Sequence, residues 1–412
     1  MICRLGTVIF YAAFQNRDVR RTQQVMAEYY RRSCPELEYV SPQLVHGKGE
    51  RTGEKIKIGF VSAYLNNHTI GKLYGGLVAA LDDDRFEITI FASSHASDEI
   101  TAQLRHEAGR FVVLPGSLQG KRAAMESIAP DILFYPDIGM TTETYFLAFS
   151  RLAPVQCAGL GHPVTTGIPA MDYYISGAEI EPDGAEEYYT EELIALPTLP
   201  FAVWPINIGA ETPSLEMDFA RDKTLYACVQ SLFKVHPDFD EILRGILERD
   251  ENGAVVFIEG MPGWSDALRA RWAKSIPEVA NRIHFMRRLN QTEFLSLIHR
   301  ADILLDTVHF CGGNTTAETL GMGKIVITWP GDYAAGRVTA AYYRQLGIED
   351  AIASSAEEYI DLAVSLSRKT ERRAELEKRI AQAAPVLFDH RDIGAAYGEF
   401  FERALHDKAL RR

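Results

Sequence analysis

The sequence has no surplus of basic residues, no long hydrophobic run and no paired cysteines. Its 412 residues carry 43 Lys and Arg against 56 Asp and Glu, which gives a formal net charge of −13. Nucleic-acid binders usually carry a basic excess, so this balance disfavours nucleic acid as a partner. No run approaches the roughly 18 apolar residues of a membrane helix, and we therefore expect no membrane span.

Familiar nucleotide and hydrolase motifs are also absent. The sequence lacks G-x-G-x-x-G after a strand, G-x-x-x-x-G-K-[ST], G-x-S-x-G and H-E-x-x-H. Dinucleotide-binding, P-loop, serine hydrolase and zinc peptidase classes are therefore disfavoured.

The cysteines are odd in number and scattered, which does not suit a disulfide framework and favours a reducing, cytoplasmic location. They are Cys3, Cys34, Cys157, Cys228 and Cys311. The first residues, up to Phe14, weakly resemble a secretory signal, but we interpret them as a segment that docks on the first domain.

The chain is longer than the roughly 250–300 residues that one hydrophobic core serves, which predicts two domains. Its apolar share of 47% and charged share of 24% are those of a globular protein and exclude extended disorder. Composition and periodicity divide the chain into an N-terminal helical support segment 1–53, a first α/β domain 54–200, a proline-rich linker 201–221, a second α/β domain 222–385 and a C-terminal helix 386–412.

Short runs rich in Ile, Val and Phe alternate with amphipathic stretches in both domains, which predicts βαβ units on parallel sheets. Ligands are then expected beyond the carboxyl ends of the strands. The predicted strands are Ile56–Ser62, Glu87–Ala92, Asp131–Tyr135, Val155–Leu160, Asp172–Ser176, Thr224–Cys228, Ala254–Glu259, Arg282–Phe285, Asp302–Asp306 and Lys324–Trp329. The predicted helices include Gly71–Leu81, Ile100–Gly109, Thr142–Ser150, Pro237–Arg249, Trp264–Ala273, Gln291–His299, Thr315–Met322 and Arg391–Leu405.

A glycine-rich turn in the second domain is the most informative segment. Gly312 and Gly313 let backbone N–H groups approach an anion, and a helix begins close to Asn314 or Thr315. The first turn of a helix offers unpaired N–H groups and a positive dipole end, to which Thr315 and Thr316 add hydroxyl groups. This pattern predicts a phosphate-binding site.

Glu318 lies about one turn into the same helix, where its carboxylate can accept both hydroxyls of a ribose. Pyrophosphate and ribose together indicate a nucleoside diphosphate. The alternative is a capping box, because Thr315-x-x-Glu318 fits that template. Capping does not require paired glycines, so we favour the nucleotide.

Further candidates follow other predicted strands. Lys234, in Phe-Lys-Val-His-Pro, follows the first strand of the second domain and can neutralise a departing diphosphate, although a surface lysine is the alternative. In the first domain, His68 lies in a strand–helix turn and Asp137 at a strand end. A Gly/Pro/Thr loop contributes His162.

Together these motifs resemble glycosyltransferase family 41, the O-linked N-acetylglucosamine transferase family, which includes bacterial protein glycosyltransferases. The motifs are the Ser-…-Asn-His-Thr turn, Ala-Pro-Val-Gln-…-Leu-Gly-His-Pro, Phe-Lys-Val-His-Pro and Gly-Asn-Thr-Thr-…-Pro-Gly, in the family's order. The resemblance implies a GT-B fold, with two Rossmann-like domains facing across a cleft. It also implies inverting, metal-independent transfer from a UDP-sugar to a protein Ser or Thr, or to Asn in the adhesin branch.

The resemblance assigns roles residue by residue. Lys234 matches the diphosphate lysine, and Thr315 and Thr316 match the pyrophosphate-binding helix start. Glu318 matches the ribose carboxylate when one residue is deleted from its helix. His68 matches a histidine near the acceptor and the donor sugar. The remaining expected contacts are Gln230, Leu289, Phe294 at the uracil, Gly312, Gly313 and Asn314 on the donor side, and Gln156, His162 and Thr166 on the acceptor side.

Three departures from the family pattern matter. Asn314 replaces a histidine near the phosphates, and His162 stands where the animal enzymes carry tyrosine. A proposed base of those enzymes matches Asp131, whereas Asp137 is better placed at a strand end. The base therefore stays open between Asp137 and His68.

We expect a UDP-sugar and an acceptor polypeptide as partners, with no cofactor and no metal. Only about 50 residues precede the resemblance, too few for an array of three 34-residue repeats, so the catalytic domains or a partner would recruit the acceptor. Two alternatives stay open. The chain could be an enzyme with a non-protein acceptor, or a UDP-sugar epimerase. It could also be a catalytically silent binding subunit, which the loss of the phosphate-side histidine would explain.

Overall fold

The computed structural model describes residues 9–45, 54–93, 97–205 and 215–410. Contacts divide the chain into two compact units: unit 1 holds residues 1–13, 17–204 and 389–412, and unit 2 holds residues 14–16 and 205–388. The expected linker 201–221 belongs partly to each unit. Its start is tied into unit 1, because Ala202 accepts from the Gly76 N–H at 3.1 Å and donates to the Leu73 carbonyl at 2.9 Å. Residues 206–214 of the linker, Cys3 and the ends of the expected support segment (1–8 and 46–53) lie outside the described residues.

Unit 1 is built on a seven-stranded sheet in which every neighbouring pair is parallel. In spatial order its strands are β4 (Arg110–Val113), β3 (Phe86–Ala92), β2 (Ile56–Ser62), β5 (Ile132–Tyr135), β7 (Val155–Gly159), β8 (Tyr173–Gly177) and β9 (Glu192–Leu196). A separate parallel pair joins β1 (Tyr39–Val40) to β6 (Ser150–Arg151). Strand order therefore reverses between β2 and β5, and loops after these two strands lie at a topological switch point.

The central strands form because their side chains are apolar on both faces. Ile58, Phe60 and Val61 of β2 are all 0% exposed, as expected when helices cover both sides of a parallel sheet. The predicted bounds of this strand are confirmed. The sequence did not predict β4, β9 or the two-residue strands β1 and β6. β9 lies at the edge of the sheet, and only Leu196 of its five residues is buried.

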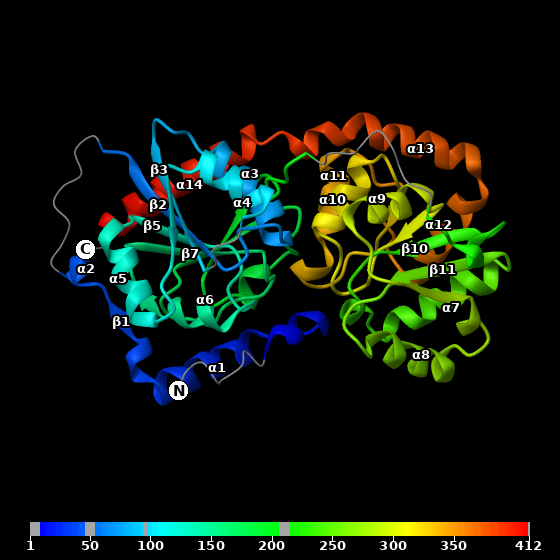
Figure 1. The fold of residues 1–412 in the computed structure, drawn as a ribbon, viewed down its shortest axis with the longest axis horizontal. Helices are drawn as coiled ribbons and strands as arrows, with labels where there is room; N and C mark the ends of the chain where they lie inside the picture. The colour runs from blue at the N-terminus through cyan, green and yellow to red at the C-terminus, as the bar shows by residue number, and fades with distance from the viewer. Residues whose placement is uncertain (1–8, 46–53, 94–96, 206–214, 411–412) are drawn as a thin grey trace. The chain divides into compact units, whose positions relative to one another are not determined.

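Helices lie on both sides of this sheet, with α3 and α4 on one side and α5 and α6 on the other (Figure 1). Their bounds are α3 (Thr69–Ala80), α4 (Glu99–Glu107), α5 (Leu118–Ile128) and α6 (Thr142–Leu147). The N-terminal part adds a 3-10 turn (Phe10–Phe14), α1 (Arg20–Ser33), a 3-10 turn (Pro35–Leu37) and α2 (Pro42–Val45), and a further 3-10 turn is Ala185–Tyr188. The predicted helices between strands are confirmed within a few residues, whereas α5 was not predicted.

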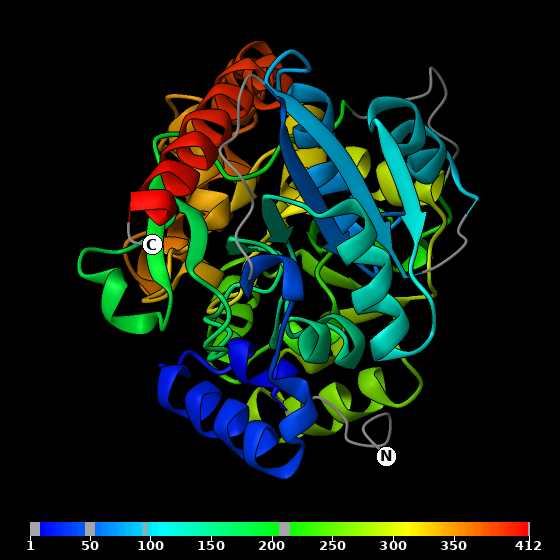
Figure 2. The same cartoon turned by 90° about the vertical axis from the view of Figure 1, so that its left-hand side faces the viewer.

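The C-terminal helix α14 (Arg391–Leu410) packs on unit 1, where Figure 2 shows it beside the sheet. The sequence placed this helix in a segment of its own, 386–412. It joins unit 1 because Tyr397 is fully buried there and donates to the Pro200 carbonyl at 3.1 Å. A Cβ on Gly394 would lie 2.1 Å from the Ala80 carbonyl oxygen, so this glycine allows the close approach of α14 to α3.

Unit 2 has a five-stranded parallel sheet in the order β12 (Ile283–Met286), β11 (Gly253–Ile258), β10 (Thr224–Cys228), β13 (Ile303–Leu305) and β14 (Val326–Ile327). Its order reverses between β10 and β13. Figure 1 shows α7 and α8 on one side of this sheet and α9 and α10 on the other. The bounds are α7 (Asp238–Arg249), α8 (Trp264–Ser275), α9 (Gln291–Arg300), α10 (Asn314–Gly321), α11 (Val338–Gln345), α12 (Ala356–Arg368) and α13 (Thr370–Ala383).

Short 3-10 turns complete unit 2: Asp218–Ala220, Leu232–Lys234, Ala280–Arg282, Ala334–Gly336 and Ala384–Phe388. All five predicted strands of this domain are confirmed; Thr224–Cys228 has the predicted bounds, and the other four strands have ends shifted by one or two residues. Among the described residues, no helix combines the length and the apolar character needed to cross a membrane.

Candidate functional site

The switch point of unit 2 gathers the residues predicted for phosphate binding. Strands β10 and β13 are paired neighbours, with Tyr226 opposite Ile303. The loop after β10 carries Gln230 and Lys234, and the loop after β13 carries the glycine turn and leads into α10. Ligands of doubly wound sheets bind at this position, beyond the carboxyl ends of the strands.

Hydrogen bonds hold the Lys234 side chain against the glycine turn. Its ammonium donates to the Cys311 carbonyl oxygen at 2.9 Å and to Gln230 Oε1 at 2.8 Å, and it lies 4.7 Å from the centre of the Phe310 ring. Burial lowers the pKa of Lys234, which the negative charge of Asp306 opposes. The surface-lysine interpretation is therefore wrong, because this side chain is partly buried and bonded to both switch-point loops.

Gly312 allows the turn to close on the start of α10. A Cβ at this position would lie 2.3 Å from Thr316 Oγ1 and 2.6 Å from Gln230 Nε2. The Gly312 N–H donates to Asp306 Oδ1 at 2.8 Å. Gln230 Nε2 in turn donates to Thr315 Oγ1 at 2.8 Å, so the two loops are joined by side-chain bonds.

Helix α10 begins at Asn314 with no side-chain cap. The first residues of a helix present N–H groups without intrahelical acceptors, which makes this end suited to an anion. Thr315 keeps its hydroxyl proton for a further bond because its oxygen accepts from Gln230. The Thr316 hydroxyl is instead buried and shares a hydrogen bond with Thr339 Oγ1 at 3.0 Å.

Glu318 lies inside α10 and not at its cap. The residue before the helix is Gly313, so Thr315 and Glu318 do not form the capping box that the sequence left open. Glu318 is 5% exposed and accepts from Gln291 Nε2 at 3.2 Å. Gln291 is the first residue of α9, the helix that also carries Phe294; Leu289 lies in the loop before it. Phe294 and Leu289 are both partly buried. Their contact with the nucleoside stays a prediction.

The switch point of unit 1 holds a buried carboxyl. Asp137 is 0% exposed, and its Oδ2 accepts from the Ser62 hydroxyl at 2.8 Å. Its Oδ1 is also buried and has no hydrogen-bond partner. Burial raises the pKa of Asp137 to about 7, against the opposing bond from Ser62. A carboxyl with this pKa can exchange a proton near neutral pH.

Asp131 lies at the opposite, amino end of β5. Its Oδ2 accepts from the Lys57 N–H at 2.9 Å, a bond that ties β5 to the start of β2. Ligands of parallel sheets bind at the carboxyl edge, so this position favours Asp137 over Asp131 as a candidate base.

His68 forms the N-cap of α3. Its Nδ1 accepts from the Ile70 N–H at 3.2 Å, and its ring stacks on Tyr64 with centroids 4.2 Å apart. Burial, and secondarily the charge of Lys72, lower the pKa of His68. The neutral ring therefore carries its proton on Nε2. In this geometry His68 offers a hydrogen-bond donor to a ligand and not a base.

The three residues expected on the acceptor side are bonded within unit 1. Gln156 accepts from the Leu152 N–H at 2.8 Å and donates to the Ala170 carbonyl at 3.0 Å. Thr166 is buried and donates to Glu191. His162 is 3% exposed, with its ring nitrogens 3.2 Å from the Ile138 oxygen and 3.3 Å from the Phe10 oxygen.

The structure gives these three side chains a role in holding loops, and burial lowers the pKa of His162. A sequence pattern shows that a polar residue lies in a loop, but not that backbone groups already bind it. For the same reason, the sequence pattern did not identify Asp306, Ser62 and Gln291, whose hydrogen bonds support the site residues. A carboxylate at a strand end before a glycine turn was the available signal for Asp306.

Comparison with known proteins links this geometry to a family. The model of Glycosyl transferase family 41 matches residues 38–203 and 212–395. The chain is 24% identical to the "Probable UDP-N-acetylglucosamine--peptide N-acetylglucosaminyltransferase SPINDLY" of Solanum lycopersicum, over 79% of this chain and 36% of the relative. It is also 24% identical to the "UDP-glucose:protein N-beta-glucosyltransferase" of Actinobacillus pleuropneumoniae, over 81% of this chain and 54% of the relative. The chain thus spans about half or less of the length of these relatives.

Solved structures show the same fold. The O-GlcNAc transferase of Thermobaculum terrenum, determined as a mutant, matches with a TM-score of 0.82 and 23% identity, over 95% of this chain and 75% of that chain. Anabaena Alr3699/HepE, in complex with UDP and glucose, matches with a TM-score of 0.55 and 12% identity, over 84% of this chain and 99% of that chain. The α/β fold is therefore of the GT-B type, and the chain belongs to glycosyl transferase family 41.

Proposed function

We propose that the protein transfers a sugar from a UDP-sugar to a Ser or Thr hydroxyl of an acceptor protein. Unit 2 is the donor-binding part of this proposal. The carrying observation is that Lys234 binds the Cys311 carbonyl beside the glycine turn, while Gln230 binds both Lys234 and Thr315 at the start of α10. A diphosphate in that position meets an ammonium group and helix N–H groups together.

The rest of the nucleotide follows from the position of α10. The pyrophosphate lies on Gly312, Gly313, Asn314 and the Thr315–Thr316 start of the helix. The ribose lies at Glu318, where Gln291 orients the carboxylate, and the uracil lies near Leu289 and Phe294. This arrangement runs from the β13 loop toward the start of α9, in the order diphosphate, ribose and base.

The reaction we propose is an inverting displacement without a metal. The acceptor oxygen forms a bond to the anomeric carbon while the bond from that carbon to the diphosphate oxygen breaks, and UDP leaves with the electron pair. Lys234 and the helix N–H groups stabilise the charge on the leaving phosphate. The hydroxyl proton passes to Asp137, directly or through water, because its pKa of about 7 lets it accept a proton near neutral pH.

Two finer assignments belong to the same proposal. The acceptor is a protein because both curated relatives described above are named for peptide or protein acceptors; one of them is named an N-glucosyltransferase, so Asn is the alternative acceptor. We also place the protein in the cytoplasm, since the described cysteines Cys34, Cys157, Cys228 and Cys311 are all unpaired thiols.

A UDP-release assay over several UDP-sugars, with and without candidate acceptor proteins and in the presence of a chelator, tests the proposal. We expect release that depends on the polypeptide, persists with the chelator and adds the mass of one hexose or N-acetylhexosamine to the acceptor. Release without any polypeptide would indicate a glycan or lipid acceptor, and conversion of the donor to its epimer would indicate an epimerase. UDP binding without turnover on every acceptor would indicate a silent binding subunit.

A further inference from the structure

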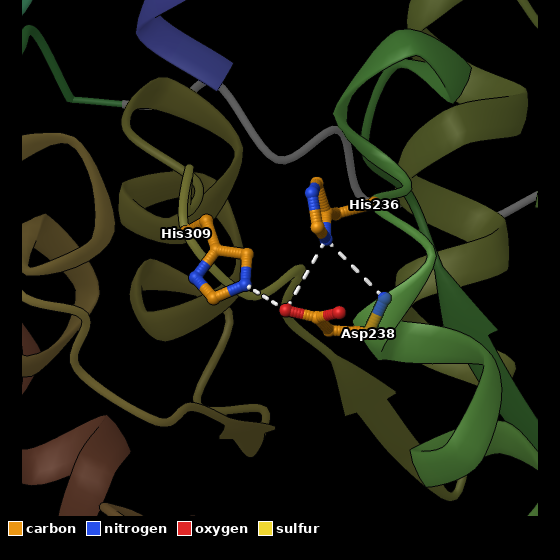
Figure 3. Close-up of side chains that lie close together, drawn as sticks. All are labelled: His236, Asp238 and His309. Carbon is orange, nitrogen blue, oxygen red and sulfur yellow. Dashed lines mark hydrogen bonds and ion pairs between the residues drawn. The ribbon is translucent and has the colours of Figure 1, made fainter. Parts of the chain in front are cut away.

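Three side chains of unit 2 that the donor site does not use converge on one point (Figure 3). His309 Nε2 lies 2.8 Å from Asp238 Oδ2, and His236 Nδ1 lies 3.4 Å from the same oxygen. The two imidazole rings are 4.8 Å apart at their centroids. The ligand atoms of all three residues lie within 4.8 Å of one another.

These residues come from the two loops that form the switch point. His236 follows the 3-10 turn that ends at Lys234, and Asp238 is the first residue of α7. His309 lies in the loop after β13 with a φ of 69°, the left-handed region that residues with a Cβ rarely adopt. The His309 ring points toward Asp238, as Figure 3 shows.

We propose that His236, Asp238 and His309 form a binding site for a divalent transition-metal ion of the Zn²⁺ type. Two imidazole nitrogens and one carboxylate oxygen suit Zn²⁺, Co²⁺ or Ni²⁺, whereas Mg²⁺ and Ca²⁺ prefer a shell of oxygens. Three protein ligands leave at least one coordination position for water.

The local geometry allows the ion to enter with small side-chain movements. The ion takes the place of the proton between His309 and Asp238, and the His309 proton moves to Nδ1. In the structure, without an ion, His236 Nδ1 accepts a hydrogen bond from the Asp238 N–H at 3.2 Å. Because this N–H lies at the exposed start of α7, water can replace that bond when the nitrogen binds the ion.

The charges around the point are compatible with a cation. The carboxylate of Asp238 supplies a negative oxygen that lies close to a nitrogen of both imidazole rings. The nearby Arg271 guanidinium is paired with Asp240 at 2.7 Å, which limits its repulsion. An ion here would join the loop of Lys234 to the loop of Cys311. The site does not depend on the glycosyl transfer proposed above, which uses no metal.

Calorimetric titration of the full chain with Zn²⁺, and with Co²⁺ followed by its visible absorption, tests the site. We expect one ion per chain at this point. Removal of one ligand, in His309→Gln, His236→Gln or Asp238→Asn, should weaken binding by at least about 10-fold. His106→Gln, which changes an exposed histidine on α4, is the matched control and should bind as the unaltered chain does.

Circular dichroism and the thermal midpoint would show that each variant is folded before its affinity is compared. The proposal is overturned if Zn²⁺ binds no more tightly than Mg²⁺. It is equally overturned if the three ligand variants keep the affinity of the control.

Discussion

Lys234 shows how one side chain can be both structural and reactive. Its ammonium bonds to the Cys311 carbonyl and to Gln230, so its position is fixed before any ligand arrives. Preorganised charge of this kind acts mainly on the transition state, where negative charge develops on the leaving phosphate.

We therefore expect Lys234→Ala to lower kcat by about 10²–10³ with a smaller change in KM. Steady-state kinetics of UDP release measures both constants. Lys274→Ala, at an exposed position of α8, is the matched control and should retain full turnover. Unchanged turnover in Lys234→Ala would exclude the leaving-group role.

The raised pKa of Asp137 predicts how the free energy of unfolding depends on pH. Its pKa rises from 3.8 to about 7 on folding, because burial penalises the charged carboxylate. Between these values the folded protein holds a proton that the unfolded chain has lost, so the free energy of unfolding falls as pH rises through this range. The loss is complete above pH 7 and amounts to at most about 4 kcal/mol.

Asp137→Asn removes this titration. The free energy of unfolding of the variant, measured relative to that of the unaltered protein, should therefore increase as the pH rises from 4 to 7. This increase is expected whether the variant is more or less stable than the unaltered protein at low pH. Urea unfolding curves at pH 5 and pH 8 measure the difference, with the exposed Asp183→Asn as control. Parallel pH dependence of Asp137→Asn and the unaltered protein would contradict a raised pKa.

At the scale of elements, the glycine turn before α10 depends on space and not on a left-handed backbone. Gly312 has no room for a Cβ because Thr316 and Gln230 occupy that volume. Gly312→Ala should push these side chains from the helix start and weaken UDP binding by at least about 10-fold, the equivalent of about 1.4 kcal/mol.

Calorimetric titration with UDP measures this loss. Gly116→Ala is the matched control, since a Cβ there meets nothing within 4 Å, and it should bind UDP normally. If Gly312→Ala keeps full affinity while remaining folded, the turn does not hold the diphosphate.

The sequence predicted elements well where a strand is buried on both faces. The bounds of Ile56–Ser62 and Thr224–Cys228 are confirmed, and both strands are buried over most of their length. It failed for β9, an edge strand in which only Leu196 is buried. In the candidate site, Lys234 and Asp137 were identified because they follow predicted strands. The hydrogen-bond partners of Gln156, His162 and Thr166 could not be predicted, because they depend on contacts between residues distant in the sequence.

At the scale of the whole molecule, α14 shows that unit 1 is discontinuous in sequence. Tyr397 of this helix packs against Phe134 of β5, with ring centroids 5.7 Å apart, and Arg85 pairs with Glu402 at 2.6 Å. The two residues of each pair are far apart in the sequence. The hydrophobic periodicity therefore predicted the helix but not that it packs on unit 1.

Tyr397→Ala should lower the stability of unit 1 by about 3–5 kcal/mol, since it leaves a cavity and an unpaired Pro200 carbonyl. UDP binding to unit 2 should remain, because that unit has its own core. Differential scanning calorimetry with and without UDP separates the two effects, and the exposed Tyr29→Ala serves as control. A parallel loss of UDP affinity would show that the units are not energetically independent.

The return of α14 to unit 1 also has a consequence for synthesis. The ribosome releases all of residues 205–388 before it releases this helix, so unit 2 can fold while unit 1 still lacks its last helix. Until then the apolar surface around Phe134 and Tyr74 is uncovered on a nascent chain. The core of unit 1 is therefore completed only when the last residues of the polypeptide have been translated.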